Sequence, residues 1–95
     1  MMSLLLNLES VINRNPNIIA SEIDEEKVMM SIEMGEYFGI DKIGSRIWDM
    51  IEKKIKIKEL IENLQEEFEV DQPTCEHDVF EFLTELYNKK LIEVE

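Results

Sequence analysis

Cys75 and His77 are the sole cysteine and the sole histidine of the chain, and they stand two residues apart. Such a pair could supply a nucleophile and its base, but at the start of a helix the two side chains point in different directions. No third residue is evident to orient them. One histidine and one cysteine also fall short of a zinc site and exclude an intrachain disulfide. We therefore expect no catalytic residue, no metal and no cofactor, and a protein that is not an enzyme.

The charge of the chain bears on its partners. The sequence has 22 acidic and 10 basic residues, and its formal net charge is −12. A nucleic-acid backbone would be repelled by most of such a surface, whereas a basic or neutral peptide would not. The one basic cluster, at residues 53–58, is interpreted as a solvated connection between elements.

The apolar segments are short. None approaches the roughly 20 residues of a membrane span, and the leucines at positions 4–6 lack the basic flank of a secretion signal. We therefore expect a cytoplasmic protein with no membrane partner.

Three strands are predicted in the first half of the chain, at residues 18–23, 27–33 and 36–41. The turn at residues 24–26 and the reversal at Gly35 join them into an antiparallel meander. In the third strand Phe38 and Ile40 leave one side, and Tyr37 and Gly39 leave the other. Asp41 then suits the N-cap of a helix, because its carboxylate can accept an amide hydrogen of the first turn.

Helices are predicted at about residues 42–54, 57–69 and 74–90 from apolar side chains at helical spacing. Residues 91–95 form a tail with at most one short strand. Ninety-five residues are enough for one core. The sequence thus predicts a single α+β domain, a three-stranded antiparallel sheet followed by three helices, with residues 1–17 as an N-terminal arm whose role stays open.

The third helix is more apolar than a core contact requires, because its apolar arc spans roughly 160°. One stripe is expected to face the core: Cys75, Val79, Phe82 and Leu86. The others are expected to line a groove: Phe80, Leu83 and Tyr87. The alternative is that all of them belong to the core of a small three-helix cluster.

The third strand is expected to have a receptive edge. The last strand of a meander leaves one row of amides and carbonyls unpaired, and residues 36–41 contain no proline or lysine that would discourage pairing. An extended peptide could therefore add to this edge, beside the groove.

The segment Tyr37-Phe38-Gly39-Ile40-Asp41, followed by Gly44 and by Ile47-Trp48, resembles the PqqD-like family. This family comprises the recognition elements of ribosomally made, modified peptides, and the resemblance is greatest to its stand-alone members in lasso-peptide gene clusters. It extends from about residue 15 to about residue 93, and the Leu-rich residues 1–17 lie largely outside it.

The resemblance implies a winged-helix-like domain that does no chemistry. Such a protein binds the leader part of a precursor peptide as an added strand and delivers it to a transglutaminase-like leader peptidase, with a macrolactam-forming cyclase downstream. Carried over to this sequence, the peptide-binding residues would be Glu36, Tyr37, Phe38, Gly39, Ile40, Asp41, Phe80, Leu83 and Tyr87.

Two alternatives stay open at this point. One is a peptide carrier for a radical-SAM enzyme, as in pyrroloquinoline quinone biosynthesis, which the neighbouring genes would distinguish. The other is a winged-helix DNA-binding regulator, which predicts a basic recognition helix. The third helix instead carries four acidic residues between positions 76 and 85, and its lysines come only at its end.

Overall fold

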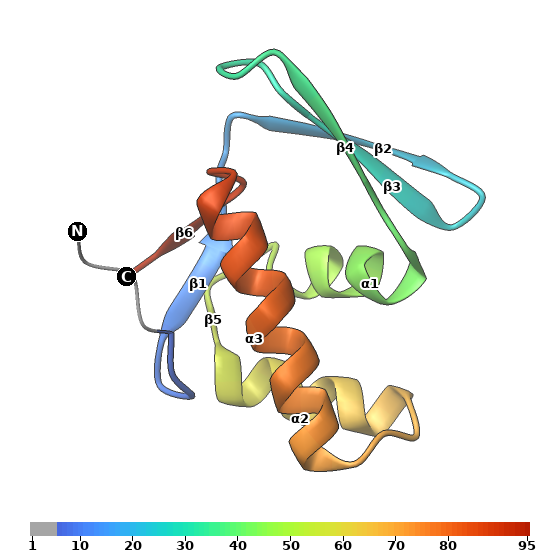
Figure 1. Ribbon diagram of the computed structural model, residues 1–95, viewed down its shortest axis with the longest axis vertical. Helices are drawn as coiled ribbons and strands as arrows, with labels where there is room; N and C mark the ends of the chain where they lie inside the picture. Colours follow the sequence, from blue (N-terminus) through green and yellow to red (C-terminus); the bar gives the residue numbers. More distant parts are fainter. Residues whose placement is uncertain (1–5) are drawn as a thin grey trace.

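The computed structural model describes residues 6–95. Figure 1 shows a three-stranded wing above a cluster of helices, with a second small sheet beside the last helix. The elements in chain order are β1 (Val11–Arg14), β2 (Ile18–Ile23), β3 (Glu26–Ser31), β4 (Glu36–Ile40), α1 (Lys42–Met50), β5 (Ile55–Lys56), α2 (Ile57–Glu67), α3 (Gln72–Asn88) and β6 (Ile92–Val94).

The wing is the antiparallel sheet β2-β3-β4, as the sequence predicted. Ala20, Met29 and Phe38 are paired across its three strands and share one face, on which Met29 is fully buried. Ile19, Met30 and Tyr37 form the next row and leave the opposite face. Because side chains alternate along a strand, this register turns Phe38 toward the helices and Tyr37 toward solvent.

A second antiparallel sheet, with strand order β5-β1-β6, was not predicted. Its central strand β1 belongs to the expected N-terminal arm, and Ile12 within it is fully buried. Residues 1–5 of that arm lie outside the described residues. The described part of the arm therefore contributes the central strand of a sheet whose other strands come from the middle and the end of the chain.

The helix starts follow from capping. The Asp41 carboxylate accepts a hydrogen bond from the Gly44 amide at 2.7 Å, as predicted for the N-cap of α1. The third helix begins at Gln72, before the predicted position 74, because Asp71 caps it by accepting the Thr74 amide at 3.1 Å. The first helix ends at Met50 and does not reach the predicted position 54, since residues 55–56 pair with β1.

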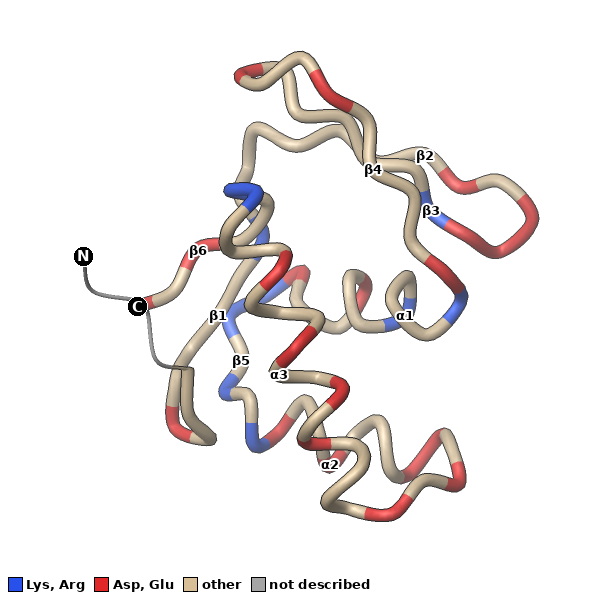
Figure 2. The backbone as a smooth tube through the Cα atoms, in the orientation of Figure 1, with Lys and Arg blue, Asp and Glu red and all other residues tan. Residues whose placement is uncertain are grey.

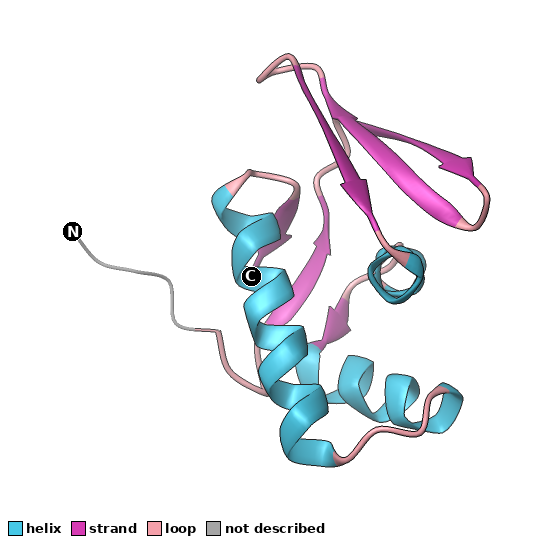
Figure 3. Ribbon diagram, turned by 45° about the vertical axis from the view of Figure 1, so that its right-hand side comes forward, coloured by secondary structure: helices cyan, strands magenta, loops and turns pink. Residues whose placement is uncertain are grey.

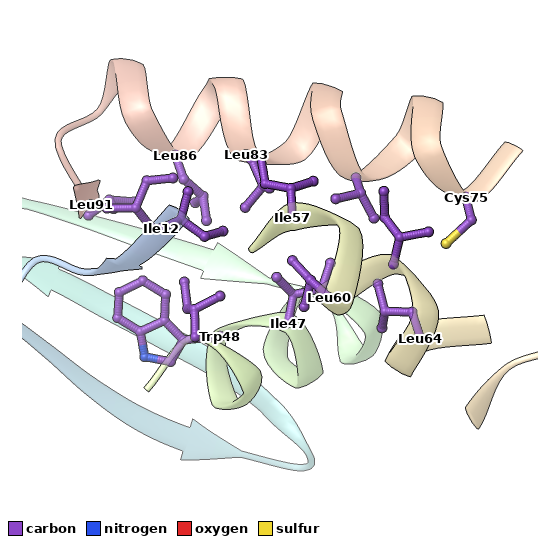
Figure 4. Close-up of a cluster of buried hydrophobic side chains, with 14 of the residues drawn as sticks. Ile12, Ile47, Trp48, Ile57, Leu60, Leu64, Cys75, Leu83, Leu86 and Leu91 are labelled. Atoms are coloured by element: carbon purple, nitrogen blue, oxygen red, sulfur yellow. The ribbon is translucent and has the colours of Figure 1, made fainter. Parts of the chain in front are cut away.

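The core lies where α1, α2, α3 and the small sheet meet. Figure 4 shows Leu83 and Leu86 pointing from α3 into this cluster of buried side chains. The fully buried members with the largest side chains are Trp48, Ile12, Met29, Ile51, Ile57, Leu60, Leu83 and Leu91. Figure 3 shows that the wing reaches away from this centre and approaches the helices mainly at α1.

Lys27 ties the wing to α1. Its amide donates a hydrogen bond to the hydroxyl of buried Ser45 at 2.8 Å. Its ammonium lies 3.0 Å from the Glu22 carboxylate and 3.2 Å from the Asp49 carboxylate, and the side chain is only 13% exposed. These contacts raise the pKa of Lys27 above its ordinary value, the Glu22 hydrogen bond most strongly, against the opposing effect of burial.

The raised pKa of Lys27 predicts a loss of stability in alkali. A group whose pKa is higher in the folded than in the unfolded state contributes its full stability below the unfolded pKa, about 10.4 for lysine. That contribution disappears as the pH rises through the folded pKa. We expect the difference in free energy of unfolding between the wild type and Lys27→Met to shrink between about pH 9 and pH 12, measured by urea denaturation. Exposed Lys58→Met is the control, and a constant difference across this range for Lys27→Met would contradict the assignment.

Candidate functional site

The strand β4 has one unpaired edge. It pairs with β3 on one side, and no strand within residues 6–95 pairs with its other side. Tyr37 is 73% exposed, and no described atom lies within 4 Å of where a Cβ of Gly39 would stand. Phe38 and Ile40 are half-buried on the side of the helices. The predicted strand residues 36–41 thus lie together along an edge that no described strand occupies, and the outer face of β4 is open at Tyr37 and Gly39.

The C-terminal end of the helix α3 approaches this edge, and the two elements run in opposite directions. In Figure 1, β4 descends toward α1 while α3 ascends toward β6. The Lys89 ammonium lies 4.9 Å from the centre of the Phe38 ring. Further down, the Phe82 ring packs on Gly44, where its nearest atom would be 3.0 Å from an added Cβ. These two contacts place the Lys89–Phe82 flank of α3 opposite the second half of β4 and the start of α1.

An open hollow of about 570 Å³ continues from this point between α1, the α2–α3 connection and α3. We call it the acidic hollow. Its floor is apolar and is formed by Ile43, Gly44, Ile47, Leu64, Phe68, Val70, Cys75, Val79 and Phe82. Its carboxylates come from Asp41, Glu69, Asp78, Glu81 and Glu85. None of the described residues that line it is a lysine or an arginine.

The structure separates the three predicted wall residues of α3. Leu83 is fully buried, so it has no exposed surface with which to line a groove. Phe80 is half-buried against the core, and Tyr87 is 38% exposed. Tyr87 lines a different hollow, of about 720 Å³, together with Asn13, Asn15 and the β6 segment. The three residues therefore do not form one wall beside β4.

Phe82, predicted to face the core, is half-buried against it, and its ring also contacts Gly44 at the start of α1. The sequence predicted that one edge of the apolar arc of α3 packs into the core. In the structure the middle of the arc does so, centred on Val79, Leu83 and Leu86. At about 100° per residue, Phe82 then lies on one flank of the core, and Phe80 and Tyr87 lie on the other. The sequence contains a pattern that groups Phe82 with charged residues. One flank of the helix carries, at helical spacing, Asp78, Phe82, Glu85 and Lys89.

The charge on α3 is mainly negative. Figure 2 shows acidic residues along most of this helix and lysines at its C-terminal end. This distribution is the reverse of a basic recognition helix that would enter a DNA groove.

Cys75 and His77 do not form a catalytic pair. Cys75 is buried at the floor of the acidic hollow, and burial, followed by the charges of Asp78, Glu76 and Asp71, raises the pKa of its thiol. A raised pKa disfavours the reactive thiolate. His77 is exposed, with its Nε2 atom 3.6 Å from the Glu81 carboxylate. Within residues 6–95, no three His, Cys, Asp or Glu side chains gather in a way that could hold a metal ion.

None of the helices in the described part of the chain is both long and apolar enough to cross a membrane.

Comparisons with known proteins relate this fold and site to a family. The family described as coenzyme PQQ synthesis protein D (PqqD) matches residues 26–92. TbiB1, solved in complex with the TbiA(beta) leader peptide, is 37% identical with a TM-score of 0.79, over 85% of this chain and 94% of that one. Lasso peptide synthetase B1, complexed with the leader peptide, is 20% identical to this chain with a TM-score of 0.76. The match covers 86% of this chain and 96% of that one and shows that the two share a fold. None of the curated proteins matches this chain in sequence.

Proposed function

Because the chain belongs to the PqqD family, we propose that it binds the leader segment of a ribosomal precursor peptide in lasso-peptide synthesis. The observation that carries this proposal is the free edge of β4 beside α3. The likeness to TbiB1 supports it, since that protein was solved with a leader peptide. In this function the protein does no chemistry and recognises an extended peptide.

We further propose that the leader adds to the wing as a fourth strand along Glu36–Asp41. The backbone of the added strand would pair with β4, and its side chains would point alternately toward Tyr37 and toward the helices. Gly39 leaves the outer face of β4 open next to exposed Tyr37, so the outward-pointing side chains of the added strand would meet no obstruction there. Phe38 and Ile40 from β4, and Phe82 and Lys89 from α3, are the side chains placed to contact the inward-pointing half of the peptide.

Backbone pairing alone cannot hold such a peptide. Ordering about six residues costs roughly 6–12 kcal/mol, whereas about four ladder hydrogen bonds return about 1 kcal/mol each. Two or three buried apolar side chains contribute roughly 1.5–3 kcal/mol apiece, which brings the sum near balance. The affinity must therefore depend strongly on apolar contacts between the peptide and the side of β4 that faces α3.

Delivery of the leader to a transglutaminase-like leader peptidase, with a macrolactam-forming cyclase downstream, is the other part of this proposal. The outer face of the wing supports it. Ile19 and Tyr37 are paired with Met30 there, and both are at least half exposed. A leader bound at the edge leaves this apolar face uncovered for a partner enzyme.

A titration with the TbiA(beta) leader peptide tests the function. We expect amide chemical-shift changes in residues 36–41 and on α3 between positions 82 and 89, measured by NMR on the labelled protein. Hydrogen exchange of β4 amides should slow, since amides on the free edge gain partners. Saturable shifts confined to the β5-β1-β6 sheet or to α2, with β4 exchange unchanged, would contradict strand addition.

A further inference from the structure

The acidic hollow continues the line of the proposed peptide site. Along β4 and into α1, Phe38 contacts Lys89, and six residues later Gly44 contacts Phe82. Asp41 follows β4 directly and also lines the hollow. A peptide paired along β4 therefore reaches the mouth of the hollow where its strand passes Asp41.

The floor of the hollow suits an apolar side chain. Ile43, in the first turn of α1, is 50% exposed and lines the hollow. The half-buried Phe82 ring lines the hollow from α3. Exposed isoleucine surface inside a concavity gains free energy when an apolar group covers it. A volume of about 570 Å³ is large enough for more than one side chain of a peptide.

The rim of the hollow suits a cation. The Glu81 carboxylate lies 3.6 Å from exposed His77, and the Glu85 carboxylate lies 3.5 Å from the Lys89 ammonium. Within residues 6–95, Asp78 and Glu69 have no cationic partner within 4.0 Å. Several carboxylates around an apolar floor attract Lys or Arg and repel Asp or Glu.

We propose, on the basis of the leader-binding function, that the acidic hollow is a second subsite that selects the leader by charge. It takes an apolar side chain flanked by Lys or Arg, from the part of the leader beyond the Asp41 end of the added strand. Strand pairing is tolerant of sequence, because it uses the backbone. The hollow adds a preference that pairing along β4 lacks.

A charge scan of the TbiA(beta) leader peptide tests this proposal. Each leader residue is replaced in turn by Lys and by Glu, and Kd is measured by fluorescence anisotropy at low salt. We expect one short run of positions at which Lys binds about three- to tenfold more tightly than Glu. This difference should fall to less than about twofold in the Asp78→Asn/Glu81→Gln variant.

The matched control carries the same change in net charge elsewhere. Glu62 and Glu66 are exposed on α2 and do not line the hollow, so Glu62→Gln/Glu66→Gln should keep the Lys preference. An equal loss in both variants would overturn the subsite and indicate a general effect of net charge. Equal Kd values for Lys and Glu at every position, with β4 amides still protected by the leader, would overturn the subsite and leave the proposed function standing. Absence of any leader binding would instead refute the proposed function.

Discussion

Replacing Phe82 by alanine is expected to weaken binding of the TbiA(beta) leader by about five- to thirtyfold. The half-buried Phe82 ring packs on Gly44 and lines the acidic hollow, at the point where a peptide leaving β4 must pass. Loss of this ring removes about 1–2 kcal/mol of apolar contact from the complex, and each 1.4 kcal/mol corresponds to a tenfold change in Kd. Isothermal titration calorimetry on the two proteins measures the difference directly.

The matched control is Phe80→Ala. Phe80 stands on the same helix and is also half-buried, but it lies on the flank of the core away from Phe82. We expect its replacement to change leader affinity by less than about threefold, provided that circular dichroism shows a folded protein. The reverse result, a large loss with Phe80→Ala and none with Phe82→Ala, would restore the wall of Phe80, Leu83 and Tyr87 that the sequence analysis predicted.

The wing was predictable because its signals are local. The β-branched residues at 18–23, the turn at residues 24–26 and Gly35 in the next reversal predict two hairpins, and in the structure Asp24, Glu25 and Gly35 take positive φ. The N-cap at Asp41 was predictable for the same reason, since a carboxylate and the amide three residues later decide it. The residues of the β4 edge could therefore be named from the sequence.

The small sheet could not be predicted in this way. The strand β5 has two residues and β6 has three, which is too short for any periodicity to appear. Their pairing with β1 joins segments more than forty and about eighty residues apart, such as Ile12 with Ile55 and Ile12 with Val94. Long-range contacts of this kind leave no pattern within a sequence window.

The prediction that Leu83 faces a groove was wrong for a different reason. An apolar arc of roughly 160° is wider than one contact, and the sequence does not say which part of it the core takes. The structure centres the core on Val79, Leu83 and Leu86, which are buried where α3 packs against α2 and β6. Phe82 and the acidic residues near it then lie on the side of α3 that faces the start of α1 and the acidic hollow.

Replacing Leu83 by alanine is expected to lower the free energy of unfolding by about 2–5 kcal/mol. Leu83 is fully buried among core residues of several elements, so truncation removes apolar contacts and leaves a cavity. A loss of this size is a large part of the 5–15 kcal/mol that typically stabilises a domain. Urea denaturation followed by circular dichroism measures it.

Tyr87→Ala is the control on the same helix. Tyr87 is 38% exposed and stands outside the buried cluster, so we expect a loss of less than about 1 kcal/mol.

Leader affinity of folded Leu83→Ala, measured at low temperature to keep the protein native, should stay within about threefold of the wild type, because the side chain has no surface to offer a peptide. If Leu83→Ala instead kept full stability and lost leader binding, Leu83 would face the groove, and the core of α3 would have to be centred elsewhere on its apolar arc.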